Sequence, residues 1–166
     1  MRYSIYLAIP LMLGLAVLQT AVLPHFTILG MSPQLPFLVA LTWGLLHTRN
    51  EGLIWGFVAG LCMDIFSISP FGLTALTYVV AIMVALVVND AFPVSRVLMP
   101  ALMAGLATIV TFILNLLILR IIGVIYNFQA LSFLPTLILL NAITILPIYW
   151  LIYFLESKFR PKQIHL

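Results

Sequence analysis

The side chains of this sequence that could do chemistry are a few carboxylates and histidines, and they lie far apart. Asp64 and Asp90 cannot share the single site of an intramembrane aspartyl protease, because an apolar segment of helical length separates them and places them near opposite faces of a membrane. Two separated aspartates are also too few for a metal-dependent lipid-headgroup transferase. The histidines fall in three different segments, at His25, His47 and His165. The sequence therefore predicts neither a carboxylate dyad, nor a zinc site, nor a histidine-based triad.

Motifs for other catalytic mechanisms are missing as well. The sequence holds no G-x-S-x-G nucleophile elbow and no glycine-rich phosphate loop. Its single cysteine, Cys62, lies inside an apolar run, which excludes disulfides within the chain and thiolate metal sites. We therefore expect a protein that is not an enzyme and that uses no cofactor and no metal.

The composition predicts a protein of the lipid bilayer. Of the 166 residues 64% are hydrophobic and 7% are charged, and the mean hydropathy is +1.26, whereas about a quarter of the residues in soluble domains are charged. The net charge of +3 is not gathered into a basic stripe with interleaved aromatic residues, so nucleic acid is not an expected partner. We expect an all-α polytopic membrane protein in which residues 1–166 form a single integral membrane domain.

Six apolar segments are long enough, or nearly long enough, to be transmembrane helices. They are residues 4–23, 36–48, 52–69, 71–89, 96–119 and 132–155. A signal peptide is the competing interpretation of the first, but its apolar stretch is too long and no small-x-small cleavage signal follows. The second segment has 13 residues, so whether it crosses the bilayer fully is left open. The charge-free segment before it, residues 25–36, is expected to be an outer loop or a re-entrant piece.

Basic residues predict the orientation of these helices. With six crossings and a cytoplasmic N-terminus, Arg120 is the one basic residue on the outer side, and the others lie inside. Both termini are therefore expected in the cytoplasm. The expected topology anchors, besides Arg2, are Arg49, Arg96, Lys158, Arg160 and Lys162. The basic tail that begins at residue 156 could also dock an acidic partner.

The third segment carries a stripe of glycines that ends at a carboxylate. Gly52, Gly56, Gly60 and Asp64 recur every four residues and so lie along one side of a helix. Small residues at this spacing let helix backbones approach closely, which is a main source of packing energy in lipid. The stripe could pack inside the bundle or against a separate transmembrane partner.

A second patch of small residues lies in the fifth segment. Its members include Ala101, Ala104 and Gly105. In the expected topology this patch and the glycine stripe share the cytoplasmic half of the membrane. We therefore expect the third and fifth helices to cross closely, with Gly56 near Ala104.

Polar side chains inside the spans need partners. A charge at the membrane centre costs about 2.5–3.5 kcal/mol on insertion scales, and by depth the best candidates to pair with Asp64 are Asn115 and Arg120. We expect these three to form a buried polar clasp, and the alternatives for Asp64 are a proton or ion relay and a contact to a partner protein. Asn141, in the sixth segment, is expected to form a helix-to-helix hydrogen bond.

Residues 36–78 resemble the family of the rod shape-determining protein MreD. The matching features are Pro36 at the start of a short apolar span, the turn Arg49-Asn50-Glu51-Gly52, the run from Gly56 through Gly60 to Asp64, and the sequence Phe71-Gly72-Leu73-Thr74-Ala75-Leu76. The number of spans and the short basic tail agree with the family too. The resemblance implies a six-helix fold similar to the substrate-binding subunits of energy-coupling-factor transporters.

The resemblance also implies a function and partners. It implies a scaffold in the bacterial inner membrane that works with the single-span protein MreC, the actin-like MreB, and the glycosyltransferase–transpeptidase pair that builds lateral peptidoglycan. In such a scaffold the glycine stripe and the outer end around Asp64, Ser67, Phe71 and Gly72 would hold the helices, and an MreC-like protein, in register within the membrane lipid.

Two other classes of function stay open. A vitamin- or small-molecule-binding transporter subunit of the same six-helix type would need polar groups that converge near the outer side. The polar side chains expected there are His25, Gln34, Asp64, Asn115, Arg120, Asn127 and Gln129. A small proton- or ion-coupled exporter would instead rely on Asp64.

Overall fold

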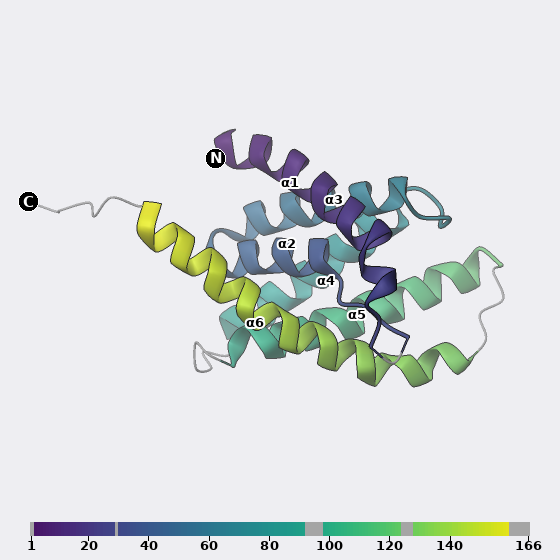
Figure 1. Cartoon of the computed structure of the whole chain (residues 1–166). Helices are drawn as coiled ribbons and strands as arrows, with labels where there is room; N and C mark the ends of the chain where they lie inside the picture. The colour runs from purple at the N-terminus through teal and green to yellow at the C-terminus, as the bar shows by residue number, and fades with distance from the viewer. Residues whose placement is uncertain (1, 29, 92–97, 124–127, 160–166) are drawn as a thin grey trace, which may run out of the picture.

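The computed structural model describes residues 2–28, 30–91, 98–123 and 128–159, and over these residues the chain is helical (Figure 1). The α-helices are α1 (Arg2–Ala21), α2 (Leu35–Leu46), α3 (Arg49–Ile65), α4 (Leu73–Ala91), α5 (Met99–Ile121) and α6 (Leu134–Phe159), and the 3-10 helices are η1 (Leu23–His25) and η2 (Phe128–Phe133). The described part contains no strand, only one isolated β-bridge between Ile28 and Met31. The prediction of an all-helical fold is confirmed for these residues.

Helix lengths sort the helices into two groups. Four helical stretches of the described residues are long and apolar enough to cross a membrane: Tyr6–His25, Leu73–Ala91, Met99–Ile121 and Leu131–Lys158. Helix α3 has 17 residues, and the apolar α2 has 12, or about 18 Å at 1.5 Å per residue, against a hydrocarbon layer of about 30 Å. The expected count of six crossings and the cytoplasmic side of the termini stay predictions.

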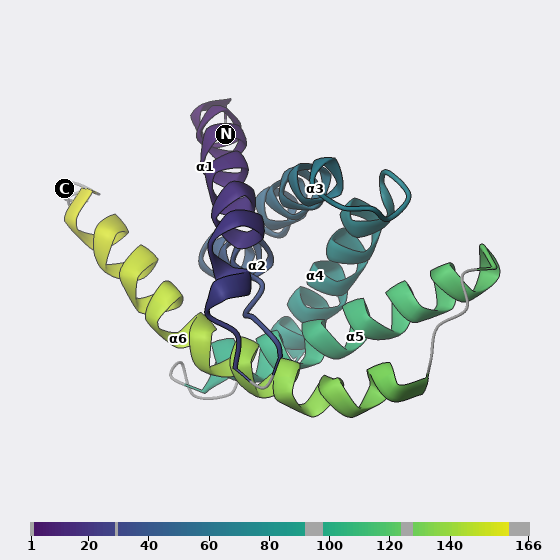
Figure 2. The same ribbon diagram turned by 45° about the vertical axis from the view of Figure 1, so that its right-hand side comes forward.

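Helix α2 lies at the centre of the bundle. It packs against each of the other five α-helices (Figures 1 and 2). Its side chains are apolar on every side, which is the pattern of a helix surrounded by protein, and Phe37, Leu38 and Leu41 are fully buried. The short apolar segment is therefore the core of the fold.

Side chains from distant helices satisfy the first amides of α2. The Gln34 N–H donates to Asn141 Oδ1 at 3.0 Å, and the Leu35 N–H donates to Gln19 Oε1 at 2.9 Å. Asn141 is fully buried and also donates to Thr108 Oγ1 at 3.0 Å. These bonds connect α1, α5 and α6 to the start of α2, and they include the helix-to-helix bond expected of Asn141.

The glycine stripe of α3 packs inside the bundle. A Cβ added to Gly52 would lie 2.5 Å from the Cα of Gly44 on α2, and one added to Gly56 would lie 2.6 Å from Ile82 Cδ1 on α4. A Cβ on Gly60 would overlap the backbone of Ala75, also on α4. The stripe therefore allows α3 to approach both neighbours closely, and little of it is left for a separate partner.

The expected crossing of the third and fifth helices is wrong. Helices α3 and α5 are not in contact, because α4 packs between them (Figure 2). Ala104 is buried, and the nearest neighbour for a Cβ on Gly105 is Ile138 Cγ2 on α6. The small residues of α5 therefore do not pack against α3, and Gly56 and Ala104 are not in contact. Helix α5 packs against α4 and α6 instead.

We predict different effects for two glycine substitutions that are identical in chemistry. Gly60→Ala should lower the free energy of unfolding in detergent by about 1–3 kcal/mol or more. The new methyl group would overlap backbone atoms of α4, which cannot move aside as a flexible side chain can. Gly105→Ala is the matched control, since its Cβ would lie 3.5 Å from Ile138, an ordinary contact. Equal stability losses for both variants, measured by thermal unfolding, would contradict this packing of α3 against α4.

Candidate functional site

The corner between α3 and α4 is held by the carboxylate of Asp64. This side chain lies in the last turn of α3 and is 4% exposed. Its Oδ2 accepts hydrogen bonds from the N–H groups of Gly72 and Ala75 at 2.9 and 3.2 Å, and its Oδ1 accepts from the Thr74 N–H at 3.0 Å. The first amides of a helix have no partner within the helix. Asp64 therefore caps the start of α4 from the preceding helix.

The connection from α3 to α4 turns tightly so that this cap can form. Gly72 has φ +91°, a backbone conformation that glycine adopts without strain. The Ser69 N–H donates to Ser67 Oγ at 3.1 Å and closes a small turn in the loop. One helical turn before the carboxylate, Gly60 lets the two backbones meet. The glycines and the aspartate of the sequence motif thus act as one structural unit.

The structure does not bring Asp64, Asn115 and Arg120 together. Asn115 Nδ2 donates to the Thr111 carbonyl at 2.9 Å and to Thr77 Oγ1 at 3.5 Å, and Arg120 is exposed. The expected clasp is therefore wrong. Helix α4 lies between α3 and α5, so the backbone N–H groups at its start are nearer to the Asp64 carboxylate than Asn115 and Arg120 are. The polar contact that fixes Asp64 is therefore between side chain and backbone.

An apolar groove opens on the exposed surface of the same corner. It has a volume of about 720 Å³, and its walls include Phe57, Leu61 and Phe71. The Phe57 and Phe71 side chains are 50% and 71% exposed. Gly72 and Ala75 also line the groove. Asp64 accepts hydrogen bonds from the backbone N–H groups of both residues. The buried cap therefore fixes the position of the groove that a partner could contact.

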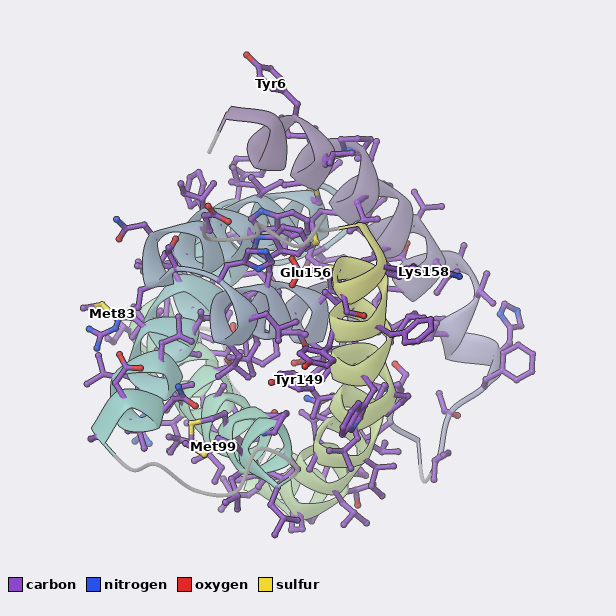
Figure 3. The ribbon with its side chains drawn as sticks, turned by 90° about the vertical axis from the view of Figure 1, so that its left-hand side faces the viewer. Tyr6, Met83, Met99, Tyr149, Glu156 and Lys158 are labelled. Atoms are coloured by element: carbon purple, nitrogen blue, oxygen red, sulfur yellow. The ribbon has the colours of Figure 1, made fainter. Side chains whose placement is uncertain are left out.

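Contacts between ionisable side chains lie at the opposite end of the bundle, where α1 begins and α6 ends (Figures 1 and 3). Arg49 Nε donates to Asp90 Oδ2 at 2.7 Å and joins α3 to α4. His47 pairs with Glu156 and joins the end of α2 to α6. Lys158 lies over the Phe154 ring at 5.9 Å.

Stacked aromatic rings lie next to the ionisable side chains at this end. Trp43 stacks on His47 and on Trp55 with centroid distances of 4.3 and 4.0 Å, and its Nε1 donates to Glu51 at 3.1 Å. Of the expected topology anchors, Arg49 and Lys158 lie at this end. Arg96, Arg160 and Lys162 fall outside the described residues.

The described residues bring together no group of three or more histidine, cysteine, aspartate or glutamate side chains that could hold a metal ion. Of the polar groups expected near the outer side, Gln34 and Asn115 are the two with described side chains that share a cavity. Asp64 is used by the cap, and His25 and Arg120 are exposed, while Asn127 lies outside the described residues. In the described residues the polar side chains discussed above bind backbone amides and other helices.

Comparison with known proteins identifies one family. A family model described as "rod shape-determining protein MreD" matches residues 1–159 of the chain, which include all the described helices. No curated protein and no solved structure matches the chain.

We predict that Asp64→Ala lowers the free energy of unfolding in detergent by about 1–3 kcal/mol or more, the cost of an unpaired buried amide. The substitution removes the acceptor of three amides, of which the Ala75 amide is buried and the Gly72 and Thr74 amides are partly buried. Asp64→Asn should fall in between, because one acceptor oxygen remains while its NH₂ group faces donors. Arg120→Ala is the control and should change stability by less than about 0.5 kcal/mol. Equal losses for Asp64→Ala and Arg120→Ala would instead favour the ion-pair clasp.

Proposed function

The chain belongs to the MreD family of rod shape-determining proteins, and on this premise we propose that it is a non-enzymatic membrane scaffold of the bacterial cell-elongation complex. In this role it supports an MreC-like single-span protein and, through the complex, lateral peptidoglycan synthesis. MreB and the glycosyltransferase–transpeptidase pair are the further proposed partners. The location is the bacterial cytoplasmic membrane, with both chain ends in the cytoplasm.

The outer groove at the α3–α4 corner is the observation that carries this proposal. The glycine stripe already packs against α2 and α4, so a partner has to use another face of α3. Phe57 projects from that other face and Phe71 from the loop before α4, and both are at least half exposed. Gly72 and apolar residues of α4 and α5 line the same groove. A second helix can pack its side chains into such an apolar groove in lipid, where packing is a main source of association energy. We propose that the membrane span of the MreC-like protein lies in this groove.

The Asp64 cap would serve the scaffold by keeping the groove in one shape. A binding surface that is already rigid loses less conformational freedom on binding. The three hydrogen bonds from α4 to Asp64 and the close contact at Gly60 hold the two walls together without a partner. This supports a positioning role for the carboxylate, and no step of proton or ion transfer is needed.

The proposal predicts which substitutions release the partner. We expect the double variant Phe57→Ala/Phe71→Ala to recover about tenfold less of the MreC-like protein when the tagged chain is purified from its native membrane in mild detergent. Truncation of an interface residue that matters costs more than about 1 kcal/mol, and about 1.4 kcal/mol already corresponds to tenfold weaker binding. The fold should survive because both side chains are exposed.

Phe154→Ala is the matched control, since this ring on α6 is 61% exposed and lies outside the groove. It should leave recovery unchanged. Equal recovery from the double variant would exclude the groove as the contact. Co-purification of transporter ATPase subunits in place of wall-synthesis proteins would overturn the scaffold and favour a small-molecule-binding transporter subunit.

A further inference from the structure

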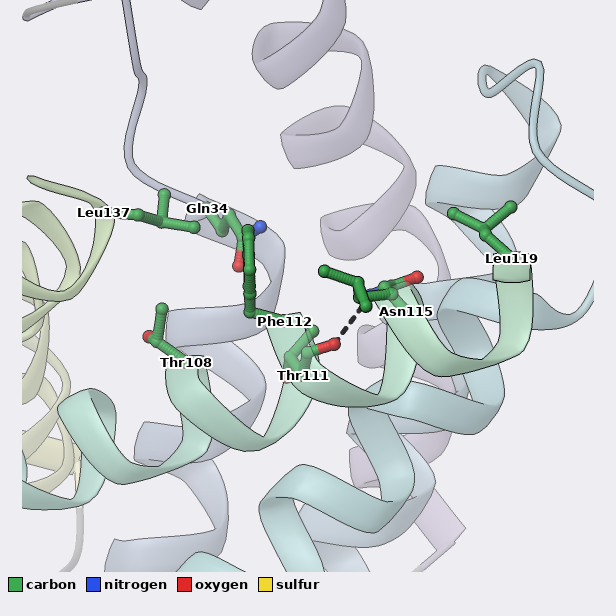
Figure 4. A pocket seen from close by; sticks show the side chains of 8 residues that line it. Gln34, Thr108, Thr111, Phe112, Asn115, Leu119 and Leu137 are labelled. Atoms are coloured by element: carbon green, nitrogen blue, oxygen red, sulfur yellow. Dashed lines mark hydrogen bonds between the residues drawn. The ribbon is translucent and has the colours of Figure 1, made fainter. Parts of the chain in front are cut away.

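A small cavity lies between α5, α6 and the start of α2, away from the α3–α4 corner (Figure 4). Its volume is about 160 Å³, close to that of an engineered cavity of about 150 Å³ that holds one benzene molecule. One part of its wall is polar, with Gln34, Thr111 and Asn115, and another part is apolar, with Phe112 and Leu137. The cavity can therefore hold one molecule about the size of a single ring.

Two polar atoms in this wall have no hydrogen-bond partner among the described residues. They are Gln34 Oε1 and Thr111 Oγ1, and the Thr111 residue is 3% exposed. A buried polar atom without a partner costs about 1–3 kcal/mol, so a ligand that bonds to both atoms would be stabilised by them. The neighbouring Thr108 hydroxyl is already used, because it donates to the Ala104 carbonyl at 2.7 Å and accepts from Asn141.

The lining defines the chemistry of the ligand. Within the described part of the chain, no charged side chain lines the cavity, so a charged ligand would stay without a counter-charge in an apolar surrounding. The amide oxygen of Gln34 can only accept a hydrogen bond, whereas the Thr111 hydroxyl can donate and accept. A hydroxyl group could therefore donate to Gln34 and accept from Thr111, while an apolar body lies against Phe112 and Leu137.

We propose that this cavity binds an uncharged molecule with one hydroxyl group and an apolar body of about six to eight heavy atoms. Two sources supply such a hydroxyl group: a free alcohol or phenol, and the uncharged headgroup of a lipid such as diacylglycerol, whose chains would remain in the bilayer. The site is separate from the groove proposed for the MreC-like protein, and it does not depend on that function.

The test uses 4-fluorophenol as the probe and the full chain in detergent micelles. Binding is followed by ¹⁹F NMR as a saturable shift beyond that of empty micelles, and fluorobenzene is run in parallel as the same ring without a hydroxyl. The test variant is Thr111→Val/Gln34→Leu, which keeps the size of both side chains and removes the two unpartnered atoms. Thr42→Val is the matched control, because its hydroxyl is also buried and unpartnered but lies outside the cavity.

We expect saturable 4-fluorophenol binding that is about tenfold weaker in the double variant and unchanged in Thr42→Val. Fluorobenzene should bind all three proteins with similar affinity. The proposal is overturned if 4-fluorophenol shows no saturable binding, as expected of a cavity that holds only water, if the double variant binds it equally well, or if the wild type binds fluorobenzene as tightly as the phenol.

A second arm separates the two sources of the hydroxyl group. The same titration is carried out in lipid nanodiscs with and without diacylglycerol. Displacement of 4-fluorophenol by diacylglycerol would support a lipid headgroup as the natural occupant. Binding of 4-fluorophenol that diacylglycerol leaves unchanged would support a free alcohol or phenol.

Discussion

The first amides of α2 and α4 are buried or partly buried, and they need acceptors that their own helices do not supply. In lipid every backbone polar group has to be satisfied by the protein itself, and the first turn of a helix cannot do this alone. The chain meets the need with side chains from other helices. Asp64 of α3 accepts from the start of α4, and Gln19 and Asn141 accept from the start of α2. These bonds connect α3 to α4, and they connect α1 and α6 to α2.

Close packing and capping support each other at the α3–α4 corner. Gly60 brings the two backbones together, and only at that short separation can the Asp64 carboxylate, one turn later, reach the amides beyond Gly72. The capped corner then presents Phe57 and Phe71 on its outer face. A sequence motif of glycines, an aspartate and a phenylalanine thus connects buried packing to the surface that we propose for a partner. The membership in a family of shape-determining membrane proteins agrees with a chain whose polar groups position helices.

The sequence predicts the helices well and their neighbours poorly. Apolar segment length places all six helices within a few residues of their observed bounds, and the glycine spacing correctly indicates a close contact. The partner of that contact and the partner of Asp64 do not follow from the sequence. Ranking side chains by depth selects Asn115 and Arg120, but the acceptor oxygens of Asp64 bind backbone N–H groups, which every residue carries and no residue type reveals. Small residues on α5 likewise indicate close packing without saying which helix fills the space.

Amide hydrogen exchange in nanodiscs tests most directly whether Asp64 caps α4. We compare the wild type with Asp64→Ala and follow the amides of Gly72, Thr74 and Ala75, with Gln34 and Leu35 at the start of α2 as internal controls. In the wild type we predict that all five exchange as slowly as amides in the middle of α4. In Asp64→Ala the three amides at the start of α4 should exchange faster, while the two at the start of α2, which are bound by other side chains, keep their protection. Unchanged exchange of the three amides in Asp64→Ala would contradict the cap.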